Sequence, residues 1–412
     1  MKTERNKITM DKKALFLEVN PVFATAKGCL GLLMNTGVKG AKELGSKIDM
    51  GVPRATDTPP EIIRAYMVSN EARYYIGNIM AEESGCDTIV DLPCGYVPRG
   101  LALTESGKEF YGLDLPAVIE ELEPVIREIA TSEQNDKMHF EAVDATNLDS
   151  LRNALKDAKG KICILTDGLL GYFNNPELDS VLNNMREILK EHGGMWITAD
   201  KFGTDLGAIT YAALTDSDGE IVRQAMRSGG TKVADIPISH TVIHGTVSEA
   251  KKYFKEHGFE IEEVTYAKKL PQLTSLNDNS DDLEKLRKAY ESIIMWVMTV
   301  KDGEVKNTDE GKEFDVQWER DGSTLVCKIT GRLDTITGPE LLSEYREQNT
   351  DGVQEIIMDL ADTEYISSAG LRVINIMSES LPDPDEFRFK NVTEDVMDIL
   401  EVTGFADVYE II

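Results

Sequence analysis

The sequence predicts two α/β domains in series, a larger one built on a doubly wound parallel sheet and a smaller one at the C-terminal end. Two observations predict this organisation. Short apolar runs alternate with helical patterns between residues 86 and 200, and the alternation restarts after a wholly polar, glycine-containing stretch near residue 301. At 412 residues the chain is long enough for two or three domains. We therefore predict a helical N-terminal cap at 1–58, the main domain at 59–300, a linker at 301–312 and a C-terminal domain at 313–412.

The main domain is predicted to begin with an amphipathic helix from Pro59 to about Glu83, where apolar residues recur every three or four positions. The strands expected after it are CDTIVDLP, GKEFYGLDLP, KMHFEAVDA, KICILTDG and MWITADKF, with helices such as PAVIEELEPVIREIA and ELDSVLNNMREILKEHGG between them. Because these strands are continuously apolar, they predict a parallel sheet covered on both faces. Two late strands, FEIEEVTYAKKL and IIMWVMTVK, could pair antiparallel and complete a seven-stranded, Rossmann-like sheet.

The C-terminal domain begins with a predicted hairpin, FDVQWERDGSTLVCKITGRLD, which has Asp321 and Gly322 at its turn. The strands expected after it are VQEIIMDLA and EFRFKNV, and the helices are LLSEYREQN, AGLRVINIMSES and VTEDVMDILEVTGF. This order predicts a small α/β domain with one sheet and helices on one face.

Charge and composition exclude several classes of partner. The net charge of -29, from 44 basic and 73 acidic residues, would repel a phosphate backbone, and no basic patch offsets it, so we expect no nucleic acid partner. No apolar run reaches the roughly 18 to 20 residues of a membrane-spanning helix. The charged start MKTERNKITMDKK lacks the apolar core of a signal peptide. We expect a cytoplasmic protein that does not contact a membrane.

The cysteines and histidines do not predict a metal site. The five cysteines are widely spread, form no C-x-x-C pair and have no histidine at a ligand spacing. We expect them to be reduced and mostly buried. His240 and His244 would share a face of a strand or a helix, but no third ligand accompanies them, so ordinary structural histidines are the better interpretation.

Four acidic residues follow the ends of successive predicted strands. Asp91 and Asp114 end the first two strands, and Asp144 and Asp167 follow the third and fourth. In open parallel sheets, ligands bind at the carboxyl ends of the strands. Asp91 could accept from an ammonium group, Asp114 from two ribose hydroxyls and Asp144 from an adenine amino group. Each aspartate taken alone could instead be a turn or helix-cap residue.

At this point residues from about 60 to 300 resemble the leucine carboxyl methyltransferase and polyketide O-methyltransferase family of class I methyltransferases. The resemblance is carried by DLPCGYVPR, YGLDLPAVIEEL and LTDGLLGYF. It implies S-adenosylmethionine as cofactor, with a small molecule or carboxylate as methyl acceptor, and Arg73 as the arginine that grips the cofactor carboxylate. The cofactor-binding residues expected on these grounds are Arg73, Asp91, Pro93, Gly95, Asp114, Leu115, Asp144, Ala145, Asp167 and Gly168. The sequence departs from the family's motifs in two respects. Pro93 and Pro98 stiffen the turn after the first strand, and Asp167 occupies the position of the family's glutamate.

Methyl transfer requires alignment of donor and acceptor more than acid catalysis. A carboxylate acceptor would need no base, whereas a phenol or enol would need one. The weak candidates for such a base are Tyr172, His240, His244 and Tyr211, and each of them is also a plausible packing residue.

The segment DTEYISSAGLRVINIM resembles the STAS domain of anti-sigma factor antagonists, and GRLDTITGPELL resembles an earlier motif of that family. Ser367 and Ser368 are expected to cap the helix that follows them. The resemblance implies that Ser368 is the residue phosphorylated by a partner kinase of the anti-sigma type. A helix N-terminus also favours an added phosphate.

Two hypotheses for function follow. The first is an S-adenosylmethionine-dependent O-methyltransferase tethered to a regulatory STAS module. The second is a non-catalytic signalling protein that senses S-adenosylmethionine and acts as an anti-sigma factor antagonist. A dehydrogenase is a poorer hypothesis, because the phosphate-binding G-x-G-x-x-G is missing. The oligomeric state, a homodimer included, is left open.

Overall fold

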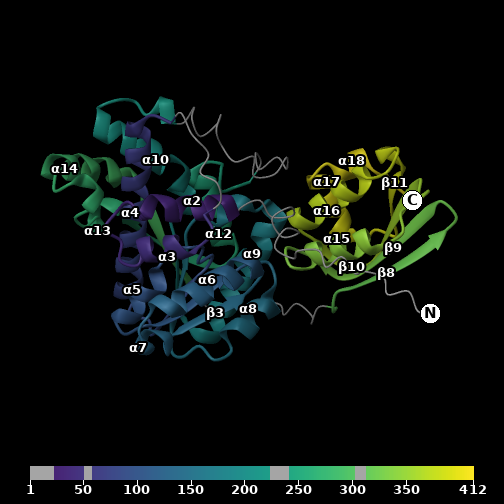
Figure 1. The fold of residues 1–412 in the computed structure, drawn as a ribbon, viewed down its shortest axis with the longest axis horizontal. Helices are drawn as coiled ribbons and strands as arrows, with labels where there is room; N and C mark the ends of the chain where they lie inside the picture. The colour runs from purple at the N-terminus through teal and green to yellow at the C-terminus, as the bar shows by residue number, and fades with distance from the viewer. Residues whose placement is uncertain (1–22, 51–57, 223–240, 302–311) are drawn as a thin grey trace. The chain divides into compact units, whose positions relative to one another are not determined.

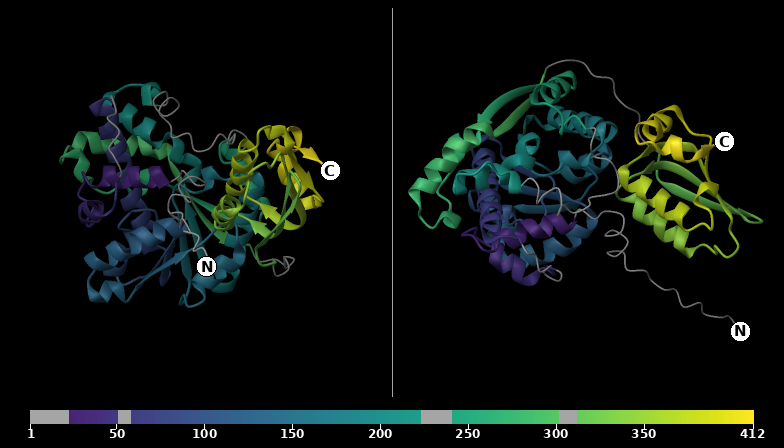
Figure 2. Two further views of the ribbon diagram at one scale, coloured as in Figure 1. Left: turned by 45° about the vertical axis from the view of Figure 1, so that its right-hand side comes forward. Right: turned by 90° about the horizontal axis from the view of Figure 1, so that it is seen from above.

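The chain folds into two compact units, each built on its own sheet. The computed structural model describes residues 23–50, 58–222, 241–301 and 312–412. One unit contains the described residues up to 301 and the other contains residues 312–412. Figure 1 colours the first unit from purple to green and the second from green to yellow, and Figure 2 shows the same units from two further sides.

The sheet of the first unit has the order β3-β2-β1-β4-β5-β7-β6. Its strands are β1 (Thr88–Asp91), β2 (Glu109–Asp114), β3 (Met138–Ala142), β4 (Ile162–Thr166), β5 (Gly194–Thr198), β6 (Phe259–Thr265) and β7 (Ile294–Val300). The first five strands pair in parallel, and β7 runs antiparallel to both β5 and β6. The predicted fold class is confirmed, including the antiparallel pair of β6 and β7 that completes the seven-stranded sheet.

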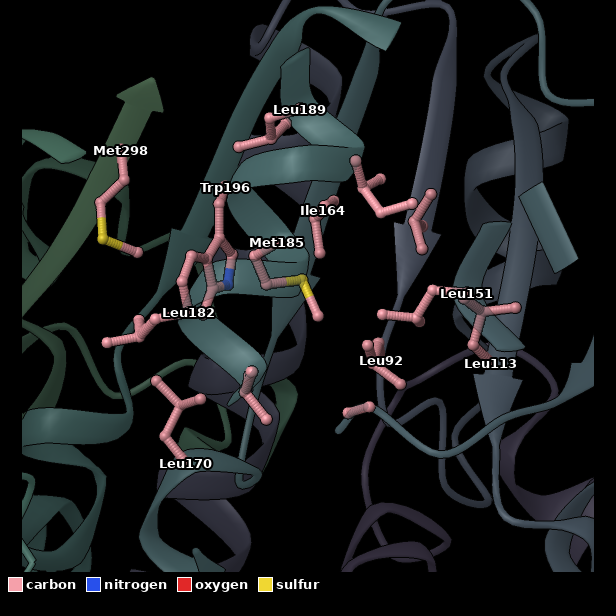
Figure 3. Packing of buried hydrophobic residues seen from close by; sticks show 14 of the residues in the cluster. Leu92, Leu113, Leu151, Ile164, Leu170, Leu182, Met185, Leu189, Trp196 and Met298 are labelled. Atoms are coloured by element: carbon pink, nitrogen blue, oxygen red, sulfur yellow. The ribbon is translucent and has the colours of Figure 1, made fainter. Parts of the chain in front are cut away.

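Helices cover this sheet and extend beyond it. The described helices are α2 (Phe23–Leu33), α3 (Ala41–Lys47), α4 (Pro60–Glu83), α5 (Arg99–Glu105), α6 (Pro116–Ile129), α7 (Ser132–Asn135), α8 (Leu148–Leu155), α9 (Asn175–His192), α10 (Asp200–Thr215), α12 (Val247–Glu256), α13 (Tyr266–Lys269) and α14 (Ser280–Ala289). Figure 3 shows Leu182, Met185 and Leu189 of α9 packed around Trp196 of β5. The buried indole of Trp196 donates through Nε1 to Thr166 Oγ1 at 2.9 Å, so its polar atom is satisfied. None of the helices in the described ranges is both long and apolar enough to cross a membrane.

The second unit has a five-stranded sheet with the order β12-β11-β10-β9-β8. Its elements are β8 (Asp315–Asp321), β9 (Thr324–Leu333), α15 (Thr337–Glu347), β10 (Glu355–Ile366), α16 (Ser368–Glu379), β11 (Phe387–Lys390), α17 (Glu394–Val402), α18 (Phe405–Val408) and β12 (Glu410–Ile411). Leu325, Cys327 and Ile329 of β9 are buried, whereas the residues between them are more exposed. One face of the sheet therefore forms the core with the helices, as predicted.

Two predicted strands end earlier than expected. The fifth was predicted to run to Phe202, but β5 ends at Thr198 and α10 begins at Asp200. The sixth was predicted to run to Leu270, but β6 ends at Thr265 and α13 follows. Both predictions were wrong because apolar residues continue past the strand, and periodicity over so few residues does not separate a strand from a helix. The short strand β12 was not predicted from the sequence.

The predicted N-terminal cap and linker fall partly outside the described residues. Within the cap, α2 and α3 agree with the helices expected in the first 50 residues, and residues 1–22 and 51–57 are not described. Residues 302–311, most of the expected linker, are also outside the described ranges. The three boundaries between the four predicted segments stay predictions.

Candidate functional site

The structure brings the four predicted aspartates to one edge of the first sheet. Asp91 and Asp114 are the last residues of β1 and β2, and Asp144 and Asp167 follow β3 and β4 by one or two residues. Because these four strands are parallel neighbours, their carboxyl ends lie along the same edge. The predicted juxtaposition therefore exists, and the role of the aspartates in binding a cofactor stays a prediction.

Asp114 is bound to the turn that follows β1. Its Oδ2 accepts a hydrogen bond from Gly95 N at 2.7 Å, and its Oδ1 accepts one from Leu115 N at 2.7 Å. Gly95 has a φ of 50°, a conformation that glycine adopts without strain. Burial raises the pKa of Asp114 to about 7, against the lowering effect of the two N–H donors. Pro93 and Leu115 are half-buried beside this turn.

Asp91 forms a buried ion pair with Arg99, the first residue of α5. Arg99 Nε lies 3.0 Å from Asp91 Oδ2, and both side chains are almost completely buried. Burial raises the pKa of Asp91 to about 6, although Arg99 acts to lower it. In the sequence Arg99 stands out only as the last residue of the motif DLPCGYVPR, and this contact was not predicted. A charged residue eight positions after a strand-end aspartate was the available signal.

Asp167 pairs with Arg73, which sequence reasoning placed in the same site. Arg73 of α4 donates through Nε to Asp167 Oδ1 at 2.9 Å, and Arg99 Nη2 lies 3.8 Å from Asp167 Oδ2. Burial alone would raise the pKa of Asp167, but the two guanidinium groups hold it below its ordinary value of 3.8. The side chains of Arg73 and Asp167 keep 22% and 24% of their surface exposed, so a ligand can reach both.

The turn after β4 is organised by Asp200, a residue that sequence reasoning missed. Its carboxylate accepts hydrogen bonds from Gly168 N at 2.6 Å, Leu169 N at 2.8 Å and Leu170 N at 2.7 Å. Gly168, predicted to bind the cofactor, is exposed and has a φ of 79°. Asp200 therefore fixes the backbone beside Asp167. The sequence segment ITADKF offered no sign of this, because the two turns are about 30 residues apart.

Asp144 is a turn residue, which is the alternative that the sequence allowed for each aspartate taken alone. Its Oδ1 accepts from both Thr146 N and Thr146 Oγ1 at 2.7 Å. The carbonyl of Ala145 accepts from Asn184 Nδ2 at 3.0 Å. Both residues lie at the predicted edge, and their contact with an adenine stays a prediction.

Helix α2 lies over the candidate site. Ala26 is the nearest residue to the position that a side chain at Gly95 would occupy, at 3.8 Å. Lys27 Nζ lies 2.9 Å from Glu121 Oε2 and 5.2 Å from the centre of the Tyr96 ring. Burial raises the pKa of the Cys29 thiol, which lies near Arg73 and Asp167. The sequence predicted a helical cap here but none of its contacts.

The candidates for a catalytic base lie in different surroundings. Tyr172 is in the short 3-10 helix η1 (Leu170–Tyr172) after Asp167, and its hydroxyl donates to Thr25 Oγ1 at 3.3 Å. His244 Nε2 lies 3.1 Å from the carbonyl oxygen of Gly171, so it is next to the same turn. Tyr211 packs in a separate apolar cluster with Ile62 and Ala208. His240 lies outside the described residues.

The described residues contain no group of three or more metal-ligating side chains of histidine, cysteine, aspartate or glutamate. The cysteines are free thiols, four of them buried and Cys29 half-buried. A cavity of about 380 Å³ in the first unit is lined by none of the predicted site residues. Its lining includes Tyr111, His139, Ser150 and Lys156.

In the second unit, the predicted phosphorylation site lies at the start of α16. Ser367 is buried, and its Oγ accepts from Ala369 N at 3.2 Å and Gly370 N at 3.3 Å, so it caps the helix. Ser368 is the first helical residue and is half-buried. The expectation that both serines cap the helix was wrong for Ser368, because an N-cap oxygen must precede the first turn. Before α15, Asp334 Oδ1 accepts from Ile336 N at 3.0 Å and Thr337 N at 3.1 Å, so Asp334 holds the turn that leads into this helix.

The second unit is a STAS domain: residues 315–412 match the family model of that description. A protein of Bordetella bronchiseptica named BtrV, provisionally described as an anti-sigma factor antagonist, is 27% identical over 92 residues. That similarity covers 22% of this chain and 78% of BtrV. The crystal structure of an anti-sigma factor antagonist from Mycobacterium paratuberculosis is 19% identical and covers 24% of this chain and 85% of its own, with a TM-score of 0.23.

The first unit is similar to solved structures of methyltransferases. An O-methyltransferase family protein from Burkholderia thailandensis is 11% identical and covers 72% of this chain and 75% of its own, with a TM-score of 0.33. Human N-acetylserotonin methyltransferase, solved in complex with SAM, is 10% identical, and the similarity covers 59% of this chain and 56% of that protein, with a TM-score of 0.30.

Proposed function

We propose that the chain is an S-adenosylmethionine-dependent O-methyltransferase whose activity is coupled to a C-terminal STAS domain. The observation that carries the proposal is the row of carboxylates at the ends of four neighbouring parallel strands, with Arg73 beside it. The acceptor is a small molecule with a carboxylate or hydroxyl oxygen. The cofactor supplies an electrophilic methyl group on a sulfonium.

The residues at this edge have the chemistry to hold the cofactor. Asp114 has two oxygens bound to the N–H groups of Gly95 and Leu115, and these oxygens retain lone pairs that can accept from ribose hydroxyls. Asp91 is suited to an ammonium group, because its carboxylate is held in place by Arg99. Arg73 is suited to a carboxylate, and the exposed part of its side chain allows such a ligand to compete with Asp167.

Alignment is the chain's main contribution to the reaction. In-line displacement needs the acceptor oxygen held behind the methyl group, and a carboxylate is already ionised at neutral pH. For a hydroxyl acceptor, Tyr172 and His244 flank the turn after β4 and could accept a proton. We therefore expect an ester product from a carboxylic acid and an ether product from a phenol.

Calorimetric titration with S-adenosylmethionine and with its demethylated product tests the site. We expect micromolar binding by the wild-type chain and a loss of about tenfold or more in Asp114→Asn, which removes the charge and keeps the shape. Asp136→Asn is the matched control, because Asp136 is exposed beyond the short helix α7. No binding by the wild-type chain at any accessible concentration would refute the proposal.

Transfer itself can be followed with a radiolabelled methyl group and mixed pools of carboxylic acids and phenols. A methyl ester releases its label as methanol in mild alkali, whereas a methyl ether does not. Binding of the cofactor without transfer to any acceptor would favour the second function, a non-catalytic sensor. That alternative is supported by α2, which lies over the Gly95 turn. It is also supported by the Arg73–Asp167 pair, because Asp167 already neutralises the arginine that is expected to bind the cofactor's carboxylate.

For the STAS domain we propose a protein partner of the anti-sigma kinase type and phosphorylation at Ser368. Support comes from the position of Ser368 as the first residue of a 12-residue helix, where backbone N–H groups favour an added phosphate. Incubation with such a kinase and ATP, followed by peptide mass spectrometry, tests this. We expect phosphate on Ser368 and none in Ser368→Ala. Phosphate on Ser367 alone, or on neither serine, would contradict the assignment.

A further inference from the structure

One buried side chain connects the elements of the candidate cofactor site. Arg99 is the first residue of α5, and its side chain is 3% exposed. Its Nε lies 3.0 Å from Asp91 Oδ2 at the end of β1, and its Nη1 donates to Asn78 Oδ1 of α4 at 2.8 Å. Its Nη2 lies 3.8 Å from Asp167 Oδ2 after β4. A single guanidinium therefore spans two strand ends and the helix that carries Arg73.

Helix α4 has a glycine where this guanidinium approaches it. A Cβ at Gly77 would lie 2.7 Å from Arg99 Nη1, closer than atoms of a relaxed structure come. Glycine in the middle of a helix is destabilising relative to alanine, so its presence in the 24-residue α4 calls for a packing reason. The room it leaves for Arg99 is such a reason.

We propose that Arg99 is a positioning residue of the cofactor site, which fixes the carboxylates of Asp91 and Asp167 and, through Asn78, the helix that carries Arg73. This inference rests on the proposed function. Arg99 binds Asp91 only through Oδ2, and no residue in the described ranges donates a hydrogen bond to Oδ1. Oδ1 is therefore the oxygen available to the cofactor's ammonium group.

The charges around Asp91 make its ionisation dependent on Arg99. The titratable groups that face it come from α5, α4, the turn after β1 and the ends of β2 and β4, and they are Arg99, Tyr74, Cys94, Asp114 and Asp167. Arg99 is the cation among them, and the two aspartates disfavour a charge on Asp91. Without Arg99, Asp91 would bind a proton more readily, and an ammonium ligand would lose its partner except at alkaline pH.

Two variants separate position from charge. Gly77→Ala displaces the guanidinium, keeps every charge and favours the helix. Arg99→Met removes the charge and keeps the length of the side chain. The matched controls are Gly203→Ala in α10, where a Cβ would meet no atom within 4 Å, and Arg152→Met on the surface of α8. Circular dichroism and thermal melts establish that each full-length variant is folded.

Calorimetric affinity for S-adenosylmethionine between about pH 6 and pH 9 is the measurement. We expect both site variants to bind about tenfold or more weakly at pH 7 and both controls to bind within about twofold of wild type. The deficit of Arg99→Met should shrink at the alkaline end, which a merely structural role would not produce. Folded Gly77→Ala that binds as tightly as wild type would overturn the proposal, and so would an equal deficit of Arg99→Met at every pH. If the wild-type chain does not bind, it is the proposed function that fails.

Discussion

Arg73 and Asp167 bind each other, although the sequence predicts that both bind the cofactor. Arg73 Nε donates to Asp167 Oδ1 at 2.9 Å, and Asp167 also lies 3.8 Å from the nearly buried guanidinium of Arg99. The carboxylate is thus the shared counter-charge of two arginines in a site of low exposure. The Asp167 carboxylate therefore stabilises the folded first unit even when no ligand is bound.

Asp167→Asn should therefore destabilise the first unit by about 2 kcal/mol, because it removes the carboxylate that Arg73 binds and leaves the buried Arg99 with Asp91. Denaturant unfolding followed by the fluorescence of Trp196 and Trp296, both buried in that unit, measures the loss. The control is Asp149→Asn on α8, where the side chain is 63% exposed and the expected change is within about 0.5 kcal/mol. Equal stabilities of the two variants would show that the Arg73–Asp167 pair contributes little.

Ser367 should contribute to the stability of α16 as its N-cap. We expect Ser367→Ala to lower the local free energy of opening by about 1 kcal/mol, and Ser367→Asp to retain most of it, because aspartate caps equally well. Hydrogen exchange over peptides from the start of α16 measures both. If Ser367→Ala leaves exchange unchanged while Ser368→Ala accelerates it, the cap has been assigned to the wrong serine.

Gly370 is required by a close approach of α16 to β9. A Cβ at this position would lie 2.6 Å from the backbone oxygen of Leu333. Although alanine favours a helix, we expect Gly370→Ala to destabilise the STAS domain by about 2 kcal/mol, since backbone must move. Gly338→Ala in α15 is the control, because its Cβ would make only an ordinary contact at 3.6 Å from Val373. Hydrogen exchange of β9 and α16 should separate the two variants, and similar exchange in both would contradict the steric argument.

His257 should make the stability of the first unit depend on pH. Its Nε2 lies 2.8 Å from Asp179 Oδ1 and its Nδ1 lies 2.8 Å from the carbonyl oxygen of Tyr253. Burial alone would lower the pKa of His257, but these two partners raise it above the ordinary 6.5. Because the pKa is higher in the folded state, the stabilisation is complete below pH 6.5 and is lost as pH rises through the folded pKa.

We therefore expect His257→Gln to cost about 1 kcal/mol at about pH 5.5 and much less at about pH 9, as measured by urea unfolding. Asp179→Asn should remove the same pH dependence, since it takes away the partner. A cost of His257→Gln that is equal at both pH values would contradict this account.

Part of the candidate site could be read from the sequence. Asp91, Asp114 and Asp167 each follow a short apolar run, and the carboxyl ends of parallel strands share an edge, so their proximity needed only the strand pattern. Arg99 and Asp200 could not be assigned in this way. The partners of Asp200 lie 30 to 32 residues away along the chain. Arg99 lies only eight residues from Asp91, but the choice between a solvated charge and a buried ion pair depends on burial.

The order of residues was sufficient for the two α/β units and for the strands and helices that alternate within them, because these depend on local periodicity. Tertiary structure decided which charges meet, namely Arg73 with Asp167 and Arg99 with Asp91. It also decided that α2 packs over the Gly95 turn. The physical reason is that ion pairing and steric approach depend on distances through space, which chain separations of up to 94 residues do not reveal.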